Sequence, residues 1–140
     1  MKRGWGKRPD ETKLAVFAMI FGVWLLVPVN SVQSPGMVFI AELADEWLCG
    51  AMFLSSGALH MFAVWVNGLH WWTPFYRAFT SFILVGMWAL FAFGFAEFNL
   101  WSTGVLVYLA LAGLAAKAFM DAMSDCRRRV NQWKDENAGV

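Results

Sequence analysis

The chain has 140 residues, of which 59% are apolar and only 15% are charged, and its formal net charge is +1. Soluble domains are usually about 45–50% apolar and about 25% charged. The composition therefore excludes a soluble globular protein and indicates a single membrane domain, because too few charges lie between positions 14 and 116 to make a surface for water: Glu42, Asp45, Glu46, Arg77 and Glu97.

Four apolar stretches have the length of a membrane-spanning helix, which needs about 20 residues to cross roughly 30 Å of hydrocarbon. They cover residues 14–30, 48–66, 78–96 and 100–117. The short separator 97–99 predicts a tight turn that makes the last two helices an antiparallel hairpin. A basic segment before an apolar run also describes a secretory signal, but the first run exceeds the usual length of about 7–15 residues. We therefore expect an all-α membrane protein with four transmembrane helices.

The distribution of positive charge predicts the orientation, because cytoplasmic segments of bacterial inner-membrane proteins are enriched in Lys and Arg. Basic residues lie in the N-terminal segment 1–13, at Arg77, and between positions 117 and 134, whereas the loops 30–47 and 97–99 contain none. Four crossings place all the basic segments on one side. Both chain ends, including the tail 118–140, are therefore expected in the cytoplasm of a bacterium, with the domain in its inner membrane.

Three carboxylates precede the second span, at Glu42, Asp45 and Glu46. Their i, i+3, i+4 spacing would place them on one face of a helix. The opposite face is apolar, so the segment predicts an amphipathic helix lying on the outer membrane surface. The acidic face is either simply solvated or a cation-binding or proton-collecting site. Hard cations need several convergent oxygens, and only these three carboxylates are close together, so no metal site is predicted.

His60 is the only strongly polar side chain inside a predicted span, and ionisable groups inside membranes are candidates for function. One interpretation is a haem ligand. The other histidine, His70, lies ten residues on, which is about 15 Å along a helix, so the second ligand would have to come from a partner chain. The alternative is a histidine that packs inside the bundle with a hydrogen bond. We predict no cofactor.

Small residues recur at four-residue spacing within each span. This spacing lets helices approach closely in lipid, within one chain or between subunits. The sequence leaves both possibilities open, and we expect a homo-oligomer. The candidate packing or oligomerisation pairs are Ala18 and Gly22, Ala51 and Ser55, Ala92 and Ala96, and Ala112 and Ala116.

The tail predicts a continued helix on which an apolar stripe, from Phe119 to Trp133, runs beside basic residues. This pattern is typical of a cytoplasmic amphipathic helix that lies on anionic lipid or packs on a neighbouring protein. Lipid anchoring explains the basic residues better than nucleic acid does. The candidate contacts with the membrane surface or a partner are Arg77, Arg127, Arg128, Arg129 and Trp133.

Motifs of enzymes are missing from the sequence, which has no phosphate-binding glycine loop, no zinc-spaced cysteine pair and no nucleophile elbow. We therefore predict no enzymatic activity. Cys49 and Cys126 fall on opposite sides of the predicted membrane, so no disulfide between them is expected.

Turn formers and small residues cluster in two stretches between about residues 45 and 128: Asn67-Gly68, Thr73-Pro74 and Arg77 after Gly50 and Gly57, and Ser102-Thr103-Gly104-Val105 with Tyr108 and Leu111-Ala112. Together they resemble small multi-helix membrane proteins of tailed bacteriophages and prophages, which are holin-like or have no assigned function. The resemblance implies a self-associating protein that permeabilises the inner membrane. The alternatives are a membrane anchor or modulator that binds a phage or host protein through its outer acidic helix or basic tail, and a haem-bearing redox anchor subunit.

Overall fold

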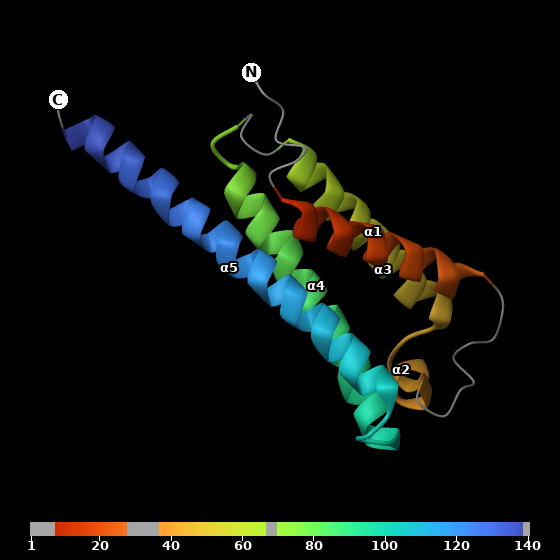
Figure 1. Cartoon of the computed structure of the whole chain (residues 1–140). Coiled ribbons are helices and arrows are strands. Elements are labelled where there is room, and N and C mark those ends of the chain that lie inside the picture. The colour runs from red at the N-terminus through yellow and green to blue at the C-terminus, as the bar shows by residue number, and fades with distance from the viewer. Residues whose placement is uncertain (1–7, 28–36, 67–69, 139–140) are drawn as a thin grey trace.

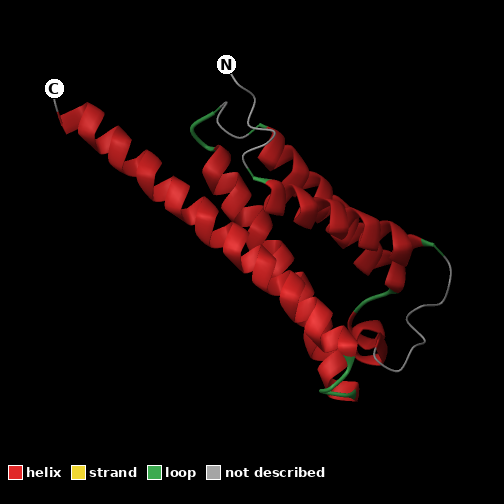
Figure 2. Ribbon diagram, viewed as in Figure 1, coloured by secondary structure: helices red, strands yellow, loops and turns green. Residues whose placement is uncertain are grey.

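The structure, a computed structural model, describes residues 8–27, 37–66 and 70–138, and all the regular elements within these ranges are helices (Figure 2). The all-α prediction is therefore confirmed. In chain order the helices are α1 (Pro9–Leu26), α2 (Val38–Leu43), α3 (Glu46–Trp65), α4 (Thr73–Phe98) and α5 (Thr103–Ala138).

Three of these helices, α3, α4 and α5, are long and apolar enough to cross a membrane, as expected of a multi-pass membrane protein. The described helix α1 is not among them, since its 18 residues include Asp10, Glu11 and Lys13. The first predicted span, 14–30, is described only as far as Val27, and residues 28–30 lie outside the described ranges, as do the N-terminal residues 1–7 and Asn67-Gly68.

The helix boundaries differ by a few residues from those of the predicted spans. Helix α4 begins at Thr73 rather than at residue 78, and Pro74 stands in its first turn, where a missing backbone N–H costs nothing. Helix α5 begins at Thr103 and continues without a break to Ala138, so the last span and the predicted tail helix are one element. The short connection between α4 and α5 makes them the antiparallel hairpin that the sequence predicted (Figure 1).

The helices form two long pairs, α1 with α3 and α4 with α5, and the pairs meet mainly where α3 packs on α4 (Figure 1). The start of α1 and the start of α4 lie at the same end of the bundle, and α5 runs past them to the end of the chain. The short helix α2 lies at the opposite end, against α4. The starts of α1 and α4, which are far apart in the sequence, thus lie at the same end of the bundle.

Glycines allow α1 and α3 to pack backbone to backbone. A Cβ added at Gly22 would stand 2.8 Å from the carbonyl oxygen of Gly50, and one added at Gly57 would stand 2.9 Å from the carbonyl oxygen of Ala15. Ala18 and Gly22, one of the predicted pairs, are both buried in this structure. Such close approach is what small residues make possible between helices in lipid.

The other predicted pairs contribute less to the packing within the chain. On α3 the close contact uses Gly50 and Gly57, whereas Ala51 is half-buried and Ser55 is exposed. The α3 pair chosen from the sequence therefore lies beside the packing face and not on it. On α4 and α5 the first member of each pair is buried and the second half-buried: Ala92 and Ala96, and Ala112 and Ala116.

An aromatic cluster joins all four long helices in the middle of the bundle. Phe21 of α1 and Phe53 of α3 have ring centroids 4.9 Å apart, and Phe53 lies 4.6 Å from Trp88 of α4. Tyr108 of α5 completes the cluster, with its ring 5.9 Å from that of Trp88 and 5.6 Å from that of Phe91. Each such pair adds about 0.5–1.5 kcal/mol beyond the burial of its area.

We predict that Gly22→Ala destabilises the bundle by about 1–3 kcal/mol, the usual cost of forcing an extra methyl group into a close-packed contact. The reason is that the new Cβ meets backbone atoms of α3, which cannot rotate away. The measurement is reversible unfolding in mild detergent, followed by near-ultraviolet circular dichroism.

The matched control is Gly86→Ala, in the interior of α4, where no described atom lies within 4 Å of the added Cβ. It should keep or slightly raise the stability of the single chain, because alanine is the better helix former. Equal destabilisation by both substitutions would contradict the α1–α3 contact.

A buried ion-pair network as the candidate functional site

The side chain of Arg77 is completely buried between helices, although it carries a permanent charge. Its Nε and Nη2 atoms donate to the two carboxylate oxygens of Glu11, at 2.9 Å and 2.5 Å. This two-pronged geometry is the one that guanidinium and carboxylate groups favour. Glu11 is itself only 4% exposed, so the pair links α1 to α4 out of contact with water.

Two further side chains complete the network. Nη1 of Arg77 donates to Oδ2 of Asp125, on α5, at 3.0 Å. Arg8, the residue before α1, donates to Glu11 at 2.8 Å and also pairs with Asp125. Arg8 and Asp125 are each about a quarter exposed. The charges of these four described groups, two positive and two negative, balance, and the groups reach from the buried pair to the surface.

The network fixes three helices relative to one another. A buried charge without a partner costs several kcal/mol, so removing one member of a buried pair is far worse than never having had the pair. The α1 carboxylate and the α5 carboxylate must therefore both reach the single guanidinium of α4. This requirement sets where α1 and α5 lie along α4.

The structure places the side chain of Arg77 elsewhere than the sequence predicts. It was expected to contact the membrane surface or a partner, but its side chain has no exposed area and lies one turn inside α4. Reasoning from the apolar spans also missed Glu11, Asp125 and Arg8, which stand outside them. The signal that could have found them is the isolation of Arg77 as the only basic residue between Lys13 and Lys117: on an apolar helix, such a charge needs a carboxylate from elsewhere.

Next to the network, His60 of α3 is buried and its Nδ1 lies 2.8 Å from the hydroxyl oxygen of Thr80. That hydroxyl also lies 3.1 Å from the carbonyl oxygen of Arg77, which connects the histidine to the network through one side chain. Among the described residues, Nε2 of His60 has no hydrogen-bond partner, and the same holds for the Ser81 hydroxyl and the Trp88 indole N–H. His60 and Ser81 thus place buried polar atoms next to the network, whereas Trp88 lies further along α4 in the aromatic cluster.

This geometry matches the packing interpretation of His60, with its hydrogen bond across to α4. His70 lies before α4 and stacks on Trp72, with ring centroids 5.5 Å apart. Within the described ranges no three His, Cys, Asp or Glu side chains converge as metal ligands. The haem hypothesis therefore still depends on a ligand from another chain.

The predicted outer helix is wrong in its extent. Helix α2 ends at Leu43, Ala44 has extended backbone angles, and a new helix starts at Glu46. Glu42, Asp45 and Glu46 thus do not share one continuous helix, and the i, i+3, i+4 argument does not apply to them. The break turns the chain from α2 into the first long helix after it, with Asp45 as the residue that precedes α3.

The basic tail leaves the bundle at the network. Cys126 is the last buried residue of α5, and every described residue after it, 127–138, is exposed, including Arg127, Arg128, Arg129 and Trp133. Both cysteines, Cys49 and Cys126, are free and buried. The end of α5 is therefore a helix that makes little contact with the rest of the chain.

No protein family matches the sequence, and comparison with curated proteins and with solved structures gives no significant match. The fold and the network define the chain as a helical protein with three helices able to cross a membrane and a buried charge cluster at one end. The resemblance to phage membrane proteins stays a prediction.

We predict that Arg77→Gln lowers the stability of the bundle by about 3–5 kcal/mol, because the buried Glu11 then keeps only the partly exposed Arg8 as a counter-charge. Asp125→Asn should cost less, since Asp125 is partly exposed and water can replace its contact. Unfolding in mild detergent measures both, and a Glu11→Gln/Arg77→Gln double variant should recover part of the loss.

The control is the exposed pair of Lys117 with Asp10, 2.7 Å apart, at the same end of the bundle. The hydrogen bond from Lys117 lowers the pKa of Asp10, yet both side chains are more than half exposed. Lys117→Gln should leave the unfolding transition unchanged. If it destabilises the bundle as much as Arg77→Gln does, the network has no special role.

Proposed function

We propose that the chain is a non-enzymatic protein of a bacterial inner membrane that crosses the bilayer four times, keeps both ends in the cytoplasm and self-associates to permeabilise the membrane, as holins do. Support for the fourth crossing comes from α1, whose outward face is charged at Asp10 and Lys13 but apolar and suited to lipid from Val16 onward. Its exposed apolar residues are Val16, Phe17, Ile20, Val23 and Trp24.

The orientation is supported by the ion-pair network. Arg8 before α1 and Arg77 at the start of α4 both pair with Asp125 of the tail, so the three basic segments of the sequence meet at one end of the bundle. Under the positive-inside rule that end faces the cytoplasm. The exposed Trp47 and Trp101 lie near the opposite end, where aromatic residues favour the other interface.

The observation that supports self-association is the position of the glycines on the helices. Neighbouring helices of the same chain fill the space beside Gly22, Gly50 and Gly57. By contrast, Gly86 of α4 and Gly113 of α5 face open space. A glycine in a helix interior costs up to about 1 kcal/mol relative to alanine. A close contact with a second copy would use these two positions in the way that the α1–α3 contact uses the others.

The network supplies the polar groups that a membrane lesion needs. In the isolated bundle the charges of Glu11 and Arg77 are hidden, and the outer faces are apolar. If copies rearrange so that α1 separates from α4, both charges become available to line a water-filled opening. The pairing of Glu11 with Arg77 would thus prevent permeabilisation of the membrane until enough copies have assembled.

We expect induced expression of the wild-type chain in a bacterium to depolarise the membrane, and a Gly86→Leu/Gly113→Leu variant to do so much less. The leucine side chains would keep the helices of two copies apart. A membrane-potential dye measures the depolarisation, and native mass measurement in mild detergent gives the number of copies.

The control is Ala58→Leu, which adds the same kind of side chain to an exposed position of α3. It should behave as the wild type does. A monomeric wild-type protein that leaves the membrane potential intact at high expression would refute the proposal. An oligomer that leaves the membrane potential intact would refute the permeabilisation but would still support the self-association.

A second function, a membrane anchor or modulator for another protein, is favoured by the free end of α5. Residues 127–138 are helical, exposed and rich in charge, with Val130 and Trp133 unpacked among them. Such a helix offers an apolar stripe and a basic face to a partner. A stoichiometric partner that co-purifies with the full chain and is lost on truncation after Cys126 would favour this function, and a homogeneous self-oligomer would count against it.

A further inference from the structure

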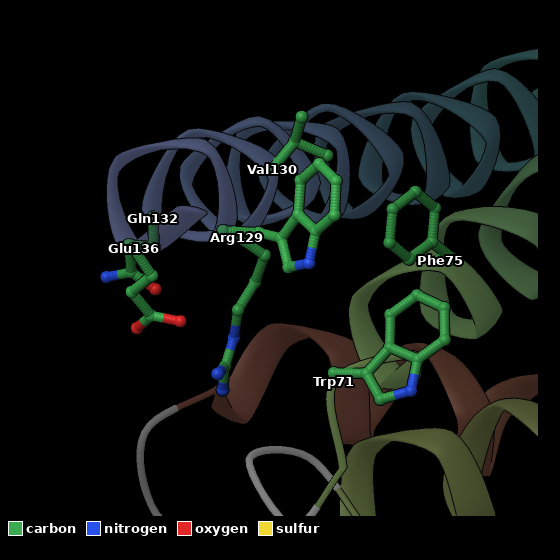
Figure 3. Close-up of a pocket in the computed structure, with 7 residues that line it drawn as sticks. Trp71, Phe75, Arg129, Val130, Gln132 and Glu136 are labelled. Atoms are coloured by element: carbon green, nitrogen blue, oxygen red, sulfur yellow. The ribbon is translucent and has the colours of Figure 1, made fainter. Parts of the chain in front are cut away.

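A pocket of about 690 Å³ lies between the segment that leads into α4 and the exposed last turns of α5 (Figure 3). Trp71 and Phe75 line it from the α4 side, and Val130 and Trp133 line it from α5. Its volume falls within the range of binding sites for small molecules. The apolar walls favour a ligand that has a hydrocarbon part.

The same pocket also carries one group of each charge. Arg129 and Glu136 line it, and Figure 3 shows both side chains leaving α5 on the same side. They are seven residues apart, which is two helical turns or about 10 Å along the axis. Within the part of the chain that the structure describes, neither takes part in an ion pair, unlike Arg77 and Arg8.

The position of the pocket along the bundle suits a lipid headgroup. Trp71 and Phe75 stand at the start of α4, where the chain enters its apolar stretch, and Trp71 is 72% exposed. Indole rings favour the boundary between headgroups and hydrocarbon. Arg129 lies one turn beyond Asp125, whose contact with Arg77 marks the same end of the bundle. Charges and rings therefore meet at the level where phospholipid headgroups lie.

We infer that this pocket binds a phospholipid with a phosphoethanolamine headgroup. The guanidinium of Arg129 holds the phosphate, the carboxylate of Glu136 accepts hydrogen bonds from the primary ammonium, and the aromatic walls cover the glycerol and the first methylenes of the acyl chains. The inference rests on the membrane location alone and does not need self-association or permeabilisation.

The choice of headgroup follows from the pair of charges. A phosphoglycerol headgroup is anionic and offers nothing positive to Glu136, which would repel it. A phosphocholine headgroup carries a positive charge, but its trimethylated nitrogen has no hydrogen to donate. Only a phosphoethanolamine headgroup of these three gives Arg129 an anion and Glu136 a charged donor.

The test is native mass spectrometry of the full chain in mild detergent, with phosphatidylethanolamine, phosphatidylcholine and phosphatidylglycerol of matched acyl chains. The wild type should retain phosphatidylethanolamine best. Arg129→Gln should weaken the retention of all three lipids roughly tenfold, the scale of one charge-assisted hydrogen bond. Glu136→Gln should remove the preference for phosphatidylethanolamine and leave the binding of phosphatidylglycerol at least as strong.

The matched controls are Arg128→Gln and Asp135→Asn, which change the same charges at neighbouring exposed positions that do not line the pocket. Both should retain lipid as the wild type does. Equal retention of the three lipids by the wild type would overturn the proposal, and so would an equal loss in Arg128→Gln and Arg129→Gln. A protein held in the pocket in place of lipid, and released by Trp133→Ala, would also overturn it.

Discussion

The pairing of Arg77 with Glu11 is the constraint on which the rest of the bundle depends. A guanidinium cannot lose its proton in a protein, so a buried one must meet a carboxylate. The partners come from α1 and α5, 66 and 48 residues away in the chain. Satisfying one charge on α4 therefore determines the approach of two other helices, and with it the positions of their remaining side chains.

Polarity inside the bundle falls with distance from this network. Thr80 lies one turn along α4 from Arg77 and accepts or donates the hydrogen bond with His60. Trp88 comes about 12 Å further on and belongs to the aromatic cluster. The buried charges are thus held at one end, and the aromatic rings occupy the middle. This arrangement lets a polar network exist in a protein whose solvent is lipid.

Two features remain outside the packing of the single chain, and both point to binding. The exposed glycines of α4 and α5 leave room for close approach by another helix, whereas the free end of α5 carries exposed charges and the exposed Trp133. The first feature bears on assembly within the membrane, and the second on what the protein holds at its boundary. Because they lie at different heights of the bundle, one chain could use both.

Much of the fold follows from the sequence alone, because hydrocarbon admits only long apolar helices with internally satisfied backbones. Helices α3, α4 and α5 and the hairpin of the last two were therefore predictable. The exact ends of the helices were less predictable. The break before Glu46 replaced a single acidic helix by two, since spacing alone does not reveal where a backbone turns.

Only the tertiary structure decided which side chains form the network and which glycines pack. Arg77, isolated in the sequence, has partners on two other helices, and nothing local distinguishes Glu11 from its exposed neighbour Asp10. Likewise, Gly22 and Gly86 look alike until neighbours fill the space beside one and not the other. The composition of the chain determines that its helices are apolar enough for a membrane. Which side chains pair across the bundle depends on how each helix is rotated about its axis. In an almost uniformly apolar segment, the periodicity of the sequence does not specify that rotation.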